Sequence, residues 1–194
     1  MRILHIFDHS LPVQTGYSFR SRAILAEQQA RGLVTAHVTS PKHAGANGGE
    51  ETVDGLSFQR TPKPTGLAAR LPGFGELAMV AATARRVGEV ADGFKPDILH
   101  AHSPVLNAMA AVRAASRRGL PVVYEIRAFW EDAAASHGTC REGDGRYRLT
   151  RFLETRAARR VDAITVICDG LRRDLIARGI AAAKITVIPN AVDT

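Results

Sequence analysis

The chain has few of the residues that define several common classes of protein. Its 194 residues include only two cysteines, Cys140 and Cys168, a single tryptophan and 6% aromatic residues. Two distant cysteines provide neither a disulfide framework nor the ligand spacing of a metal cluster. Apolar runs are only a few residues long, which argues against a membrane-spanning helix, and the N-terminal run becomes polar at Asp8, too early for a secretory signal. We therefore expect a reduced, cytosolic protein.

Negative charge is also scarce, and the excess of positive charge comes almost entirely from arginine. The chain has 26 Lys and Arg against 19 Asp and Glu, a formal net charge of +7, and only four of the cations are lysines. Arginine-rich composition is typical of GC-rich coding, and anionic membranes, nucleic acids and phosphorylated substrates are the functional alternatives. The densest stretch, 141–160, has seven arginines against three acidic residues. It lacks the interleaved aromatics of a single-strand binder, so we expect no nucleic-acid partner.

Strand-like and helix-like segments alternate along the chain. Short, nearly continuous apolar runs predict strands buried on both faces, as in a parallel sheet, and periodic apolar residues with capping signals predict helices. The expected strands are 2–7, 34–39, 56–60, 97–101, 121–126, 163–166 and 185–188. The expected helices are 18–31, 76–91, 104–118, 145–160 and 170–178. Segments 41–51 and 61–75, rich in glycine and proline, are predicted to be flexible loops.

This alternation predicts one α/β domain with a Rossmann-like, doubly wound parallel sheet of about seven strands. No internal repeat, low-complexity segment or linker divides the chain. Ligands of such sheets bind at the carboxyl ends of the strands, near the point where the strand order reverses. Here that point is expected between strands 2–7 and 97–101, so the residues that follow the strands are the candidate site residues.

Helix 145–160 combines many arginines with an apolar stripe. We expect Leu149, Phe152, Leu153 and Ala157 to face the core. The arginines on the other side of the helix then allow only peripheral contact with anionic lipid.

The loop after the first predicted strand ends in a glycine that precedes a helix. Gly16 at this position lets a ligand approach the backbone, and the helix N-terminus favours a phosphate or another anion. A plain turn glycine is the alternative. The Gly-x-Gly-x-x-Gly fingerprint of dinucleotide sites and the Gly-x-x-x-x-Gly-Lys-Ser/Thr phosphate loop are both absent from the sequence.

Two histidines alternate at the end of the fourth predicted strand. Alternate strand residues point to one face, so His100 and His102 are placed where they could share a metal ion. No cysteine or acidic residue is spaced nearby to complete such a site, so we expect no metal. His102 comes just before a helix that begins at Pro104 and is interpreted as a polar group that points into the crevice. A solvated loop histidine is the alternative.

The fifth predicted strand carries a pair of opposite charges. Glu125 and Arg127 share a face by alternation, which suits recognition of hydroxyl groups, as in a sugar; a structural ion pair fits equally well. Trp130 is a candidate sugar-stacking platform, although packing in the core is the simpler expectation. Neither cysteine has the arrangement of a catalytic nucleophile, and no Gly-x-Ser-x-Gly elbow occurs.

Taken together, these strand ends resemble the N-terminal domain of a GT-B glycosyltransferase of the large retaining family 4, and the resemblance covers essentially the whole chain. Segment 188–193, Ile-Pro-Asn-Ala-Val-Asp, is similar to the family's Pro-Asn-Gly-Val-Asp at the interdomain connection. Segment 124–132, with loop 9–12, resembles a narrower bacterial subgroup that occurs with exosortase-linked extracellular polysaccharide gene clusters. The other matching elements are 2–6, Gly16, 53–55, 96–102 and 163–166.

The resemblance implies a division of labour between two Rossmann-like domains around a cleft. Residues 1–188 would be the acceptor-side domain and 189–194 the start of the interdomain connection, with the donor-binding domain absent from this chain. Two departures stand out: a single glycine, Gly16, where many members have two, and Ala191 in place of the connection glycine. In the family, helix ends and basic side chains meet the charge of the leaving diphosphate, so no metal or other cofactor is expected.

The resemblance also assigns roles to individual residues. It implies that Gly16 approaches the donor diphosphate and that His102, the catalytic candidate, contacts the transferred sugar. The remaining candidates for binding the acceptor or the sugar are His9, Gln14, Glu125 and Arg127.

Three functions are therefore considered. The first is the acceptor half of a retaining hexosyltransferase that uses a nucleotide-sugar donor and a lipid-linked or polysaccharide acceptor, in the cytoplasm or at the inner face of the cytoplasmic membrane. The second is a stand-alone nucleotide- or sugar-binding module without catalysis. The sequence that follows Thr194 discriminates between these two. The third, a nucleic-acid binder, rests on net charge alone and would show salt-dependent retention on DNA.

Overall fold

The apolar runs form the strands of one mostly parallel sheet. The computed structural model describes residues 1–45, 47–66, 74–136 and 138–191. The strand order is β3-β4-β2-β1-β5-β6-β7-β8, and every neighbouring pair is parallel except β3 with β4. The strands are β1 (Arg2–Phe7), β2 (Val34–Thr39), β3 (Gly49–Val53), β4 (Leu56–Arg60), β5 (Ile98–His102), β6 (Val122–Ile126), β7 (Ala163–Val166) and β8 (Ile185–Val187).

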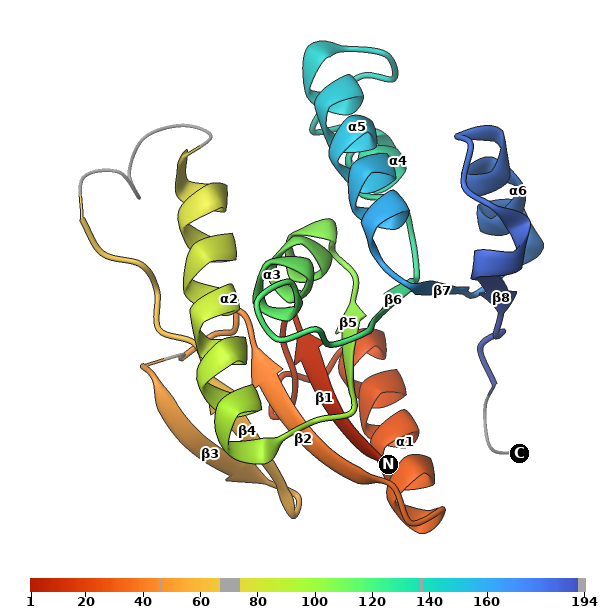
Figure 1. Cartoon of the computed structure of the whole chain (residues 1–194). Coiled ribbons are helices and arrows are strands. Elements are labelled where there is room, and N and C mark those ends of the chain that lie inside the picture. Colours follow the sequence, from red (N-terminus) through yellow and green to blue (C-terminus); the bar gives the residue numbers. More distant parts are fainter. Residues whose placement is uncertain (46, 67–73, 137, 192–194) are drawn as a thin grey trace.

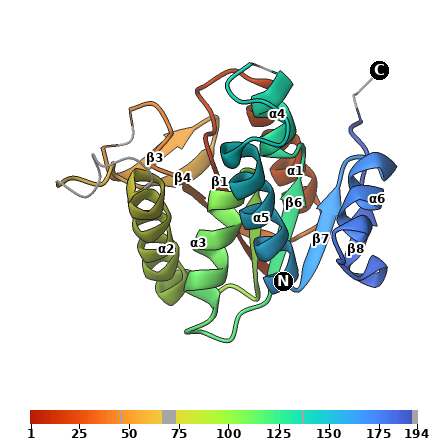
Figure 2. The same ribbon diagram turned by 90° about the horizontal axis from the view of Figure 1, so that it is seen from above.

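Helices cover the two faces of the sheet unequally. Figures 1 and 2 show α2, α3, α5 and α6 on one face and α1 on the other. Right-handed crossovers require this division, because the chain leaves β1 toward β2 in one direction and leaves β5 toward β6 in the opposite direction. The helices are α1 (Gly16–Ala30), α2 (Phe74–Phe94), α3 (Val105–Ala115), α4 (Trp130–Ser136), α5 (Gly145–Arg160) and α6 (Asp169–Ala177), with a 3-10 turn at Ala182–Lys184.

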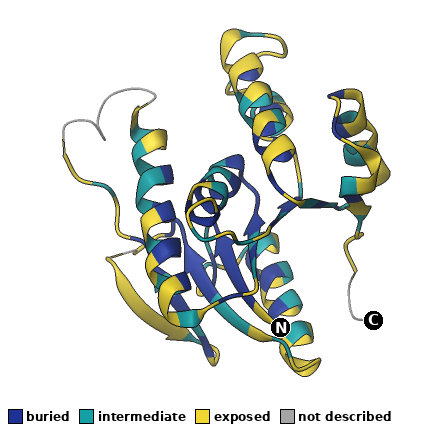
Figure 3. Cartoon of the chain, viewed as in Figure 1, coloured by how far each residue is buried: buried dark blue, intermediate teal, exposed yellow. Residues whose placement is uncertain are grey.

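The core lies between the central strands and the helical layer, where Figure 3 shows the buried residues concentrated. Leu4, Ile6 and Leu99 are fully buried in β1 and β5. Ala108 and Ala111 of α3 have no exposed surface either, and their small side chains let this helix pack closely on the sheet. Among the residues that the structure describes, no helix is both long enough and apolar enough to cross a membrane.

The structure confirms the α/β class and the position of the reversal, and it adds two elements that the sequence analysis did not predict. β3 begins inside the predicted loop 41–51 and continues to Val53, so the sheet has eight strands rather than about seven. It is an exposed edge strand, with Glu50 and Glu51 in place of apolar residues, so periodicity cannot find it. A turn with positive φ at Asp54 and Gly55 joins it to β4. α4 is the second addition; residue 46 and residues 67–73 of the predicted loops lie outside the described residues.

The predicted orientation of α5 is confirmed for Ala157, which is buried, but is wrong for two of the other residues of the stripe. Leu149 and Phe152 are 58% and 59% exposed. The residues that α5 buries are Tyr147, Glu154, Ala157 and Ala158. The Tyr124 hydroxyl of β6 donates a hydrogen bond to Glu154 Oε1 over 2.6 Å, so a polar contact sets the buried face, and part of the apolar stripe points to solvent.

Candidate functional site

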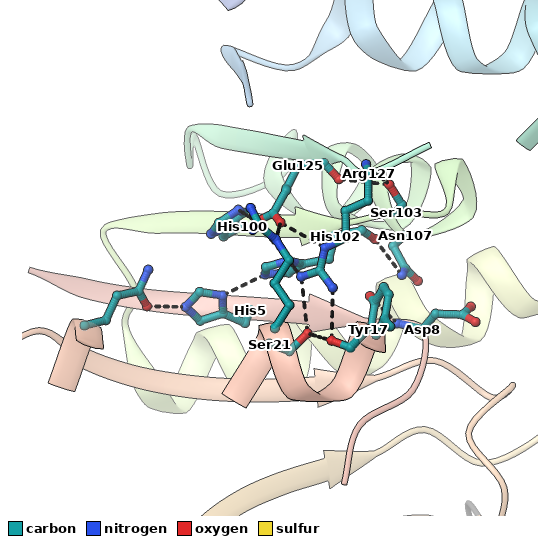
Figure 4. Close-up of polar contacts among 12 residues, drawn as sticks. His5, Asp8, Tyr17, Ser21, His100, His102, Ser103, Asn107, Glu125 and Arg127 are labelled. Carbon is teal, nitrogen blue, oxygen red and sulfur yellow. Dashed lines mark hydrogen bonds and ion pairs between the residues drawn. The ribbon is translucent and has the colours of Figure 1, made fainter. Parts of the chain in front are cut away.

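Polar side chains converge where the strand order reverses, between β1 and β5. His5 pairs in register with His100, and His102 pairs with Glu125. Alternation directs these side chains to the sheet face that α1 covers, and the rings of His100 and His102 lie with their centroids 4.2 Å apart. We call His5, His100, His102, Glu125 and Arg127 the histidine–glutamate cluster; Figure 4 shows it between the sheet and α1.

A chain of hydrogen bonds fixes the tautomers of two of the histidines. Arg127 Nη2 lies 2.9 Å from His102 Nδ1, and because a guanidinium only donates, Nδ1 is the acceptor. His102 therefore carries its proton on Nε2, which donates to His5 Nδ1 over 3.0 Å. His5 in turn donates from Nε2 to Gln28 Oε1 of α1 over 2.8 Å. The chain is satisfied at every step with both imidazoles neutral.

Glu125 is the anion of the cluster. Its Oε1 accepts hydrogen bonds from Arg20 Nε and Arg127 Nε, each over 2.9 Å, and its Oε2 lies 3.3 Å from His102 Nδ1 and 3.4 Å from His100 Nε2. Burial opposes ionisation, but the Arg127 guanidinium holds the pKa of this carboxyl well below its usual range. Glu125 is therefore a fixed carboxylate that orients two arginines.

Two histidines of the cluster, His5 and His102, are kept neutral by their surroundings. Burial, followed by the neighbouring His100, lowers the pKa of His102 to about 3, and burial also lowers the pKa of His5 well below its usual value. A neutral imidazole at neutral pH exchanges hydrogen bonds rather than supplying a proton as a stored acid. The cluster therefore suits the orientation of hydroxyl groups more than acid catalysis by an imidazolium.

His102 lies at the carboxyl end of β5, as expected, but its side chain has no exposed surface. Arg127 folds back from the end of β6 and covers it. The same guanidinium donates to the carbonyl of Tyr17 over 3.0 Å and to Ser21 Oγ over 3.2 Å. It therefore joins the first turns of α1 to His102.

Gly16 is the first residue of α1, and space around it is open. A Cβ placed on Gly16 would meet no atom within 4 Å, so a ligand can approach this backbone closely. Gln14 is exposed in the preceding loop. His9 is half-buried and shares a hydrogen bond with Thr15 Oγ1 over 2.9 Å. Gly16 and His102 thus lie on the same side of the sheet, and Arg127 links His102 to Tyr17, the residue that follows Gly16.

Asn190 extends this network beyond the sheet. Arg20, which donates to Glu125, also donates from Nη1 to Asn190 Oδ1 over 2.7 Å. Asn190 belongs to the segment identified by resemblance as the interdomain connection. The connection therefore touches the cluster through one arginine.

The cluster has the residue types of a metal site, but its geometry favours a hydrogen-bonded network. The ligand atoms of His5, His100 and His102 lie within 4.8 Å of one another, and Glu125 supplies the acidic neighbour that the sequence analysis did not expect. However, Arg127 occupies the Nδ1 lone pair of His102, and the Nε2 proton of His102 occupies the Nδ1 lone pair of His5. The half-buried Arg127 guanidinium would also repel a cation.

Sequence reasoning missed several members of the network and misplaced one aromatic residue. His5 stands out in hindsight as a polar residue within the apolar run of β1, whereas Arg20 and Gln28 of α1 carry no local signal. Trp130 is not a core residue: it is 41% exposed, and Lys42 Nζ lies 4.8 Å from its ring centroid. Its neighbours Phe129 and Glu131 are buried instead.

Solved structures of GT-B proteins share this fold. Sucrose-phosphate synthase from Thermosynechococcus elongatus is 11% identical with a TM-score of 0.71, over 99% of this chain and 48% of that one. UDP-GlcNAc 2-epimerase from Neisseria meningitidis, bound to UDP-GlcNAc, is 14% identical with a TM-score of 0.63, over 96% and 45%. HepE from Anabaena, in complex with UDP, is 15% identical with a TM-score of 0.63, over 100% and 45%.

The chain thus spans less than half the length of each of these structures. No curated protein sequence matches it significantly. At such identities, the structural similarity establishes the GT-B Rossmann-like fold alone. The family is established separately, because the glycosyl transferase 4-like domain matches residues 15–191, nearly the whole chain. The chain belongs to the glycosyl transferase 4-like domain family.

Proposed function

We propose that the chain is the N-terminal, acceptor-side half of a retaining glycosyltransferase, which moves a hexose from a nucleotide sugar to a lipid-linked or polysaccharide acceptor. The observation that carries the proposal is the family match over 15–191 together with the cluster at the reversal of strand order. UDP or UDP-GlcNAc bound in structures of similar fold supports a nucleotide-sugar ligand.

The proposed roles follow from the surroundings of each residue. The open backbone at Gly16 and the N-terminus of α1 face the donor diphosphate. His102 contacts the transferred sugar as a neutral hydrogen-bonding group, and a sugar hydroxyl takes over the bond that Arg127 donates to it. Glu125 is held by two guanidinium groups, so it orients Arg127 and does not act as a nucleophile. His9 and Gln14, in the loop beside Gly16, contact the acceptor.

The catalytic site in this proposal needs a second α/β unit. Positioning of donor and acceptor supplies much of the rate of a group transfer, and stabilisation of the leaving diphosphate supplies more. Residues 1–194 offer one helix N-terminus for that charge and no complete phosphate-binding motif. The chain by itself is therefore expected to bind nucleotide sugars weakly and to transfer none.

The exposed face of α5 supports peripheral contact with a membrane. Leu149 and Phe152 point outward, and a groove of about 770 Å³ between α2, α3 and α5 has Arg113, Arg156 and Arg160 among its lining residues. Each such cation adds up to ~1 kcal/mol of attraction to anionic lipid. This supports a location at the inner face of the cytoplasmic membrane, where a lipid-linked acceptor is presented. The similarity of 124–132 to the exosortase-associated subgroup suggests exopolysaccharide biosynthesis as the context.

The proposal is tested with the complete polypeptide that contains this chain. It is incubated with a panel of nucleotide sugars and a polyprenyl-diphosphate-linked acceptor, and products are identified by mass spectrometry. His102→Ala should reduce transfer at least tenfold, by about the value of one well-placed polar contact in the transition state. His37→Ala is the matched control, because His37 is also a buried histidine but lies on β2 outside the cluster. Epimerisation of the donor without transfer to any acceptor would contradict the proposal.

A further inference from the structure

Two exposed side chains meet above the carboxyl edge of the sheet, outside the cluster. Lys42 follows β2 and Trp130 begins α4, and the ammonium lies 4.8 Å from the centroid of the indole ring. In the sheet, β1 and β5 separate β2 from β6. Three inter-strand steps correspond to about 14 Å, so this pair spans the ends of β1 and β5. It therefore lies across the point where the strand order reverses.

Each member of the pair is held outward by buried neighbours. Phe129 and Glu131, on either side of Trp130, are 3% and 0% exposed. Arg178 fixes both of them: its Nη1 donates to Glu131 Oε1 over 2.6 Å, and its guanidinium lies 4.0 Å from the ring centroid of Phe129. The indole of Trp130, which is 41% exposed, is therefore held outward by two anchored neighbours.

Lys42 is presented in the same way. Pro41 and His43 on either side of it are buried, whereas Lys42 is exposed. Its backbone N–H donates to Ser40 Oγ over 3.2 Å, and Ser40 Oγ donates to the carbonyl of Asp8, which ties this segment to the loop that follows β1. Among the residues that the structure describes, no carboxylate lies within ion-pair distance of the Lys42 ammonium. Its charge is therefore free to pair with an anion.

We propose that Lys42 and Trp130 form a binding platform for an acidic saccharide, a sugar ring that carries a phosphate or a carboxylate. The apolar C–H face of the sugar packs on the indole, and the ammonium pairs with the anionic group as a point charge. This inference rests on the proposed function and extends it, because Ser40 ties Lys42 to Asp8, at the start of the loop that contains His9 and Gln14, so its occupant is the acceptor. The acceptor is then an anionic sugar rather than a neutral one.

The sole tryptophan of the chain makes the platform directly observable. Emission of Trp130 in residues 1–194 is recorded while glucose 1-phosphate, glucuronate, glucose or inorganic phosphate is added. Glucose 1-phosphate carries its negative charge on a phosphate, and glucuronate carries it on a carboxylate. Both should shift or quench the emission saturably, while glucose and inorganic phosphate alone should leave it unchanged over the same concentrations.

Variants of Lys42 test whether binding of the acidic sugars depends on the positive charge of its side chain. Lys42→Gln should weaken the apparent affinity for both acidic sugars about tenfold, the usual value of one hydrogen bond to a charged group, and Lys42→Arg should restore it. Lys63→Gln is the matched control, since Lys63 is an exposed lysine after β4 and should change nothing. Circular dichroism confirms that each variant is folded.

Several outcomes would overturn the platform. They are no change in emission with any probe, an equal response to glucose, an equal response to inorganic phosphate alone, and a response that Lys42→Gln leaves intact. No nucleotide sugar is used, so this test can fail while transfer by the complete polypeptide stands. Conversely, a failed transfer assay does not affect the binding result.

Discussion

Glu154→Gln should remove a pH dependence of stability that a single buried carboxyl imposes. Glu154 has no exposed surface, and its Oε2 has no hydrogen-bond partner among the described residues. Burial, reinforced by Glu131, raises its pKa from 4.5 to about 8, although Tyr124 acts in the opposite direction. Between these two values the folded protein holds a proton that the unfolded chain has released. Stability therefore falls as pH rises, by about 1.4 kcal/mol per pH unit.

By pH 7 the resulting loss in the free energy of unfolding amounts to about 3 kcal/mol, which is an upper value for one fully buried group. Glutamine keeps an acceptor for the Tyr124 hydroxyl and does not titrate, so the stability of the variant relative to the native protein should rise steadily between pH 5 and pH 8. Urea unfolding followed by circular dichroism at each pH measures the difference. Glu142→Gln is the control, because Glu142 is exposed. Parallel stability curves for the native protein and Glu154→Gln would refute the reasoning and show that Glu154 is ionised in the fold.

Four further predictions concern the cluster, the membrane and the isolated chain. His5→Leu leaves the Nε2 proton of His102 without an acceptor, so it should cost about 1–3 kcal/mol of unfolding free energy; an unchanged urea midpoint would contradict the chain of hydrogen bonds. Because the pKa of His102 is lowered from 6.5 to about 3, its contribution to stability is complete above pH 6.5 and is lost as pH falls toward 3. Phe152→Ser should reduce sedimentation with anionic liposomes, whereas equal sedimentation with neutral and anionic liposomes at low salt would exclude the docking face. Residues 1–194 alone should show no transfer, and calorimetry giving micromolar affinity for a nucleotide sugar would place the donor site in this half.

The sequence was sufficient to predict the parts of the fold that repeat a simple pattern. Apolar runs such as the one in β1 located the parallel strands, and alternation correctly placed Glu125 beside Arg127. The reversal of strand order between β1 and β5 followed from the alternation of strands with helices. These predictions succeed because burial on both faces of a strand leaves a nearly continuous apolar run in the sequence itself.

The rest depends on contacts between distant segments. The hydrogen bond of His5 to Gln28 joins β1 to the far part of α1, and neither residue predicts the other. The orientation of α5 is set by Glu154, whose burial is favoured only because Tyr124 of β6 lies opposite. The periodicity argument considers apolar residues alone, so it assigned Phe152 to the core. The rotation of the helix is set instead by the hydrogen bond between Tyr124 and Glu154, which are thirty positions apart in the sequence.

The sharing of Arg20 between Glu125 and Asn190 has a mechanical consequence. Its guanidinium donates hydrogen bonds both to the carboxylate of Glu125 on β6 and to the side-chain amide of Asn190, in the segment that follows β8. Hydrogen bonds act only over short distances, so a displacement of that segment by an ångström or two makes Arg20 release one partner or follow the other. If Arg20 follows Asn190, Glu125 Oε1 retains only Arg127 of its two donors. A movement of the segment that contains Asn190 would therefore change, through Arg20 alone, the number of positive charges that contact Glu125 beside the buried histidines.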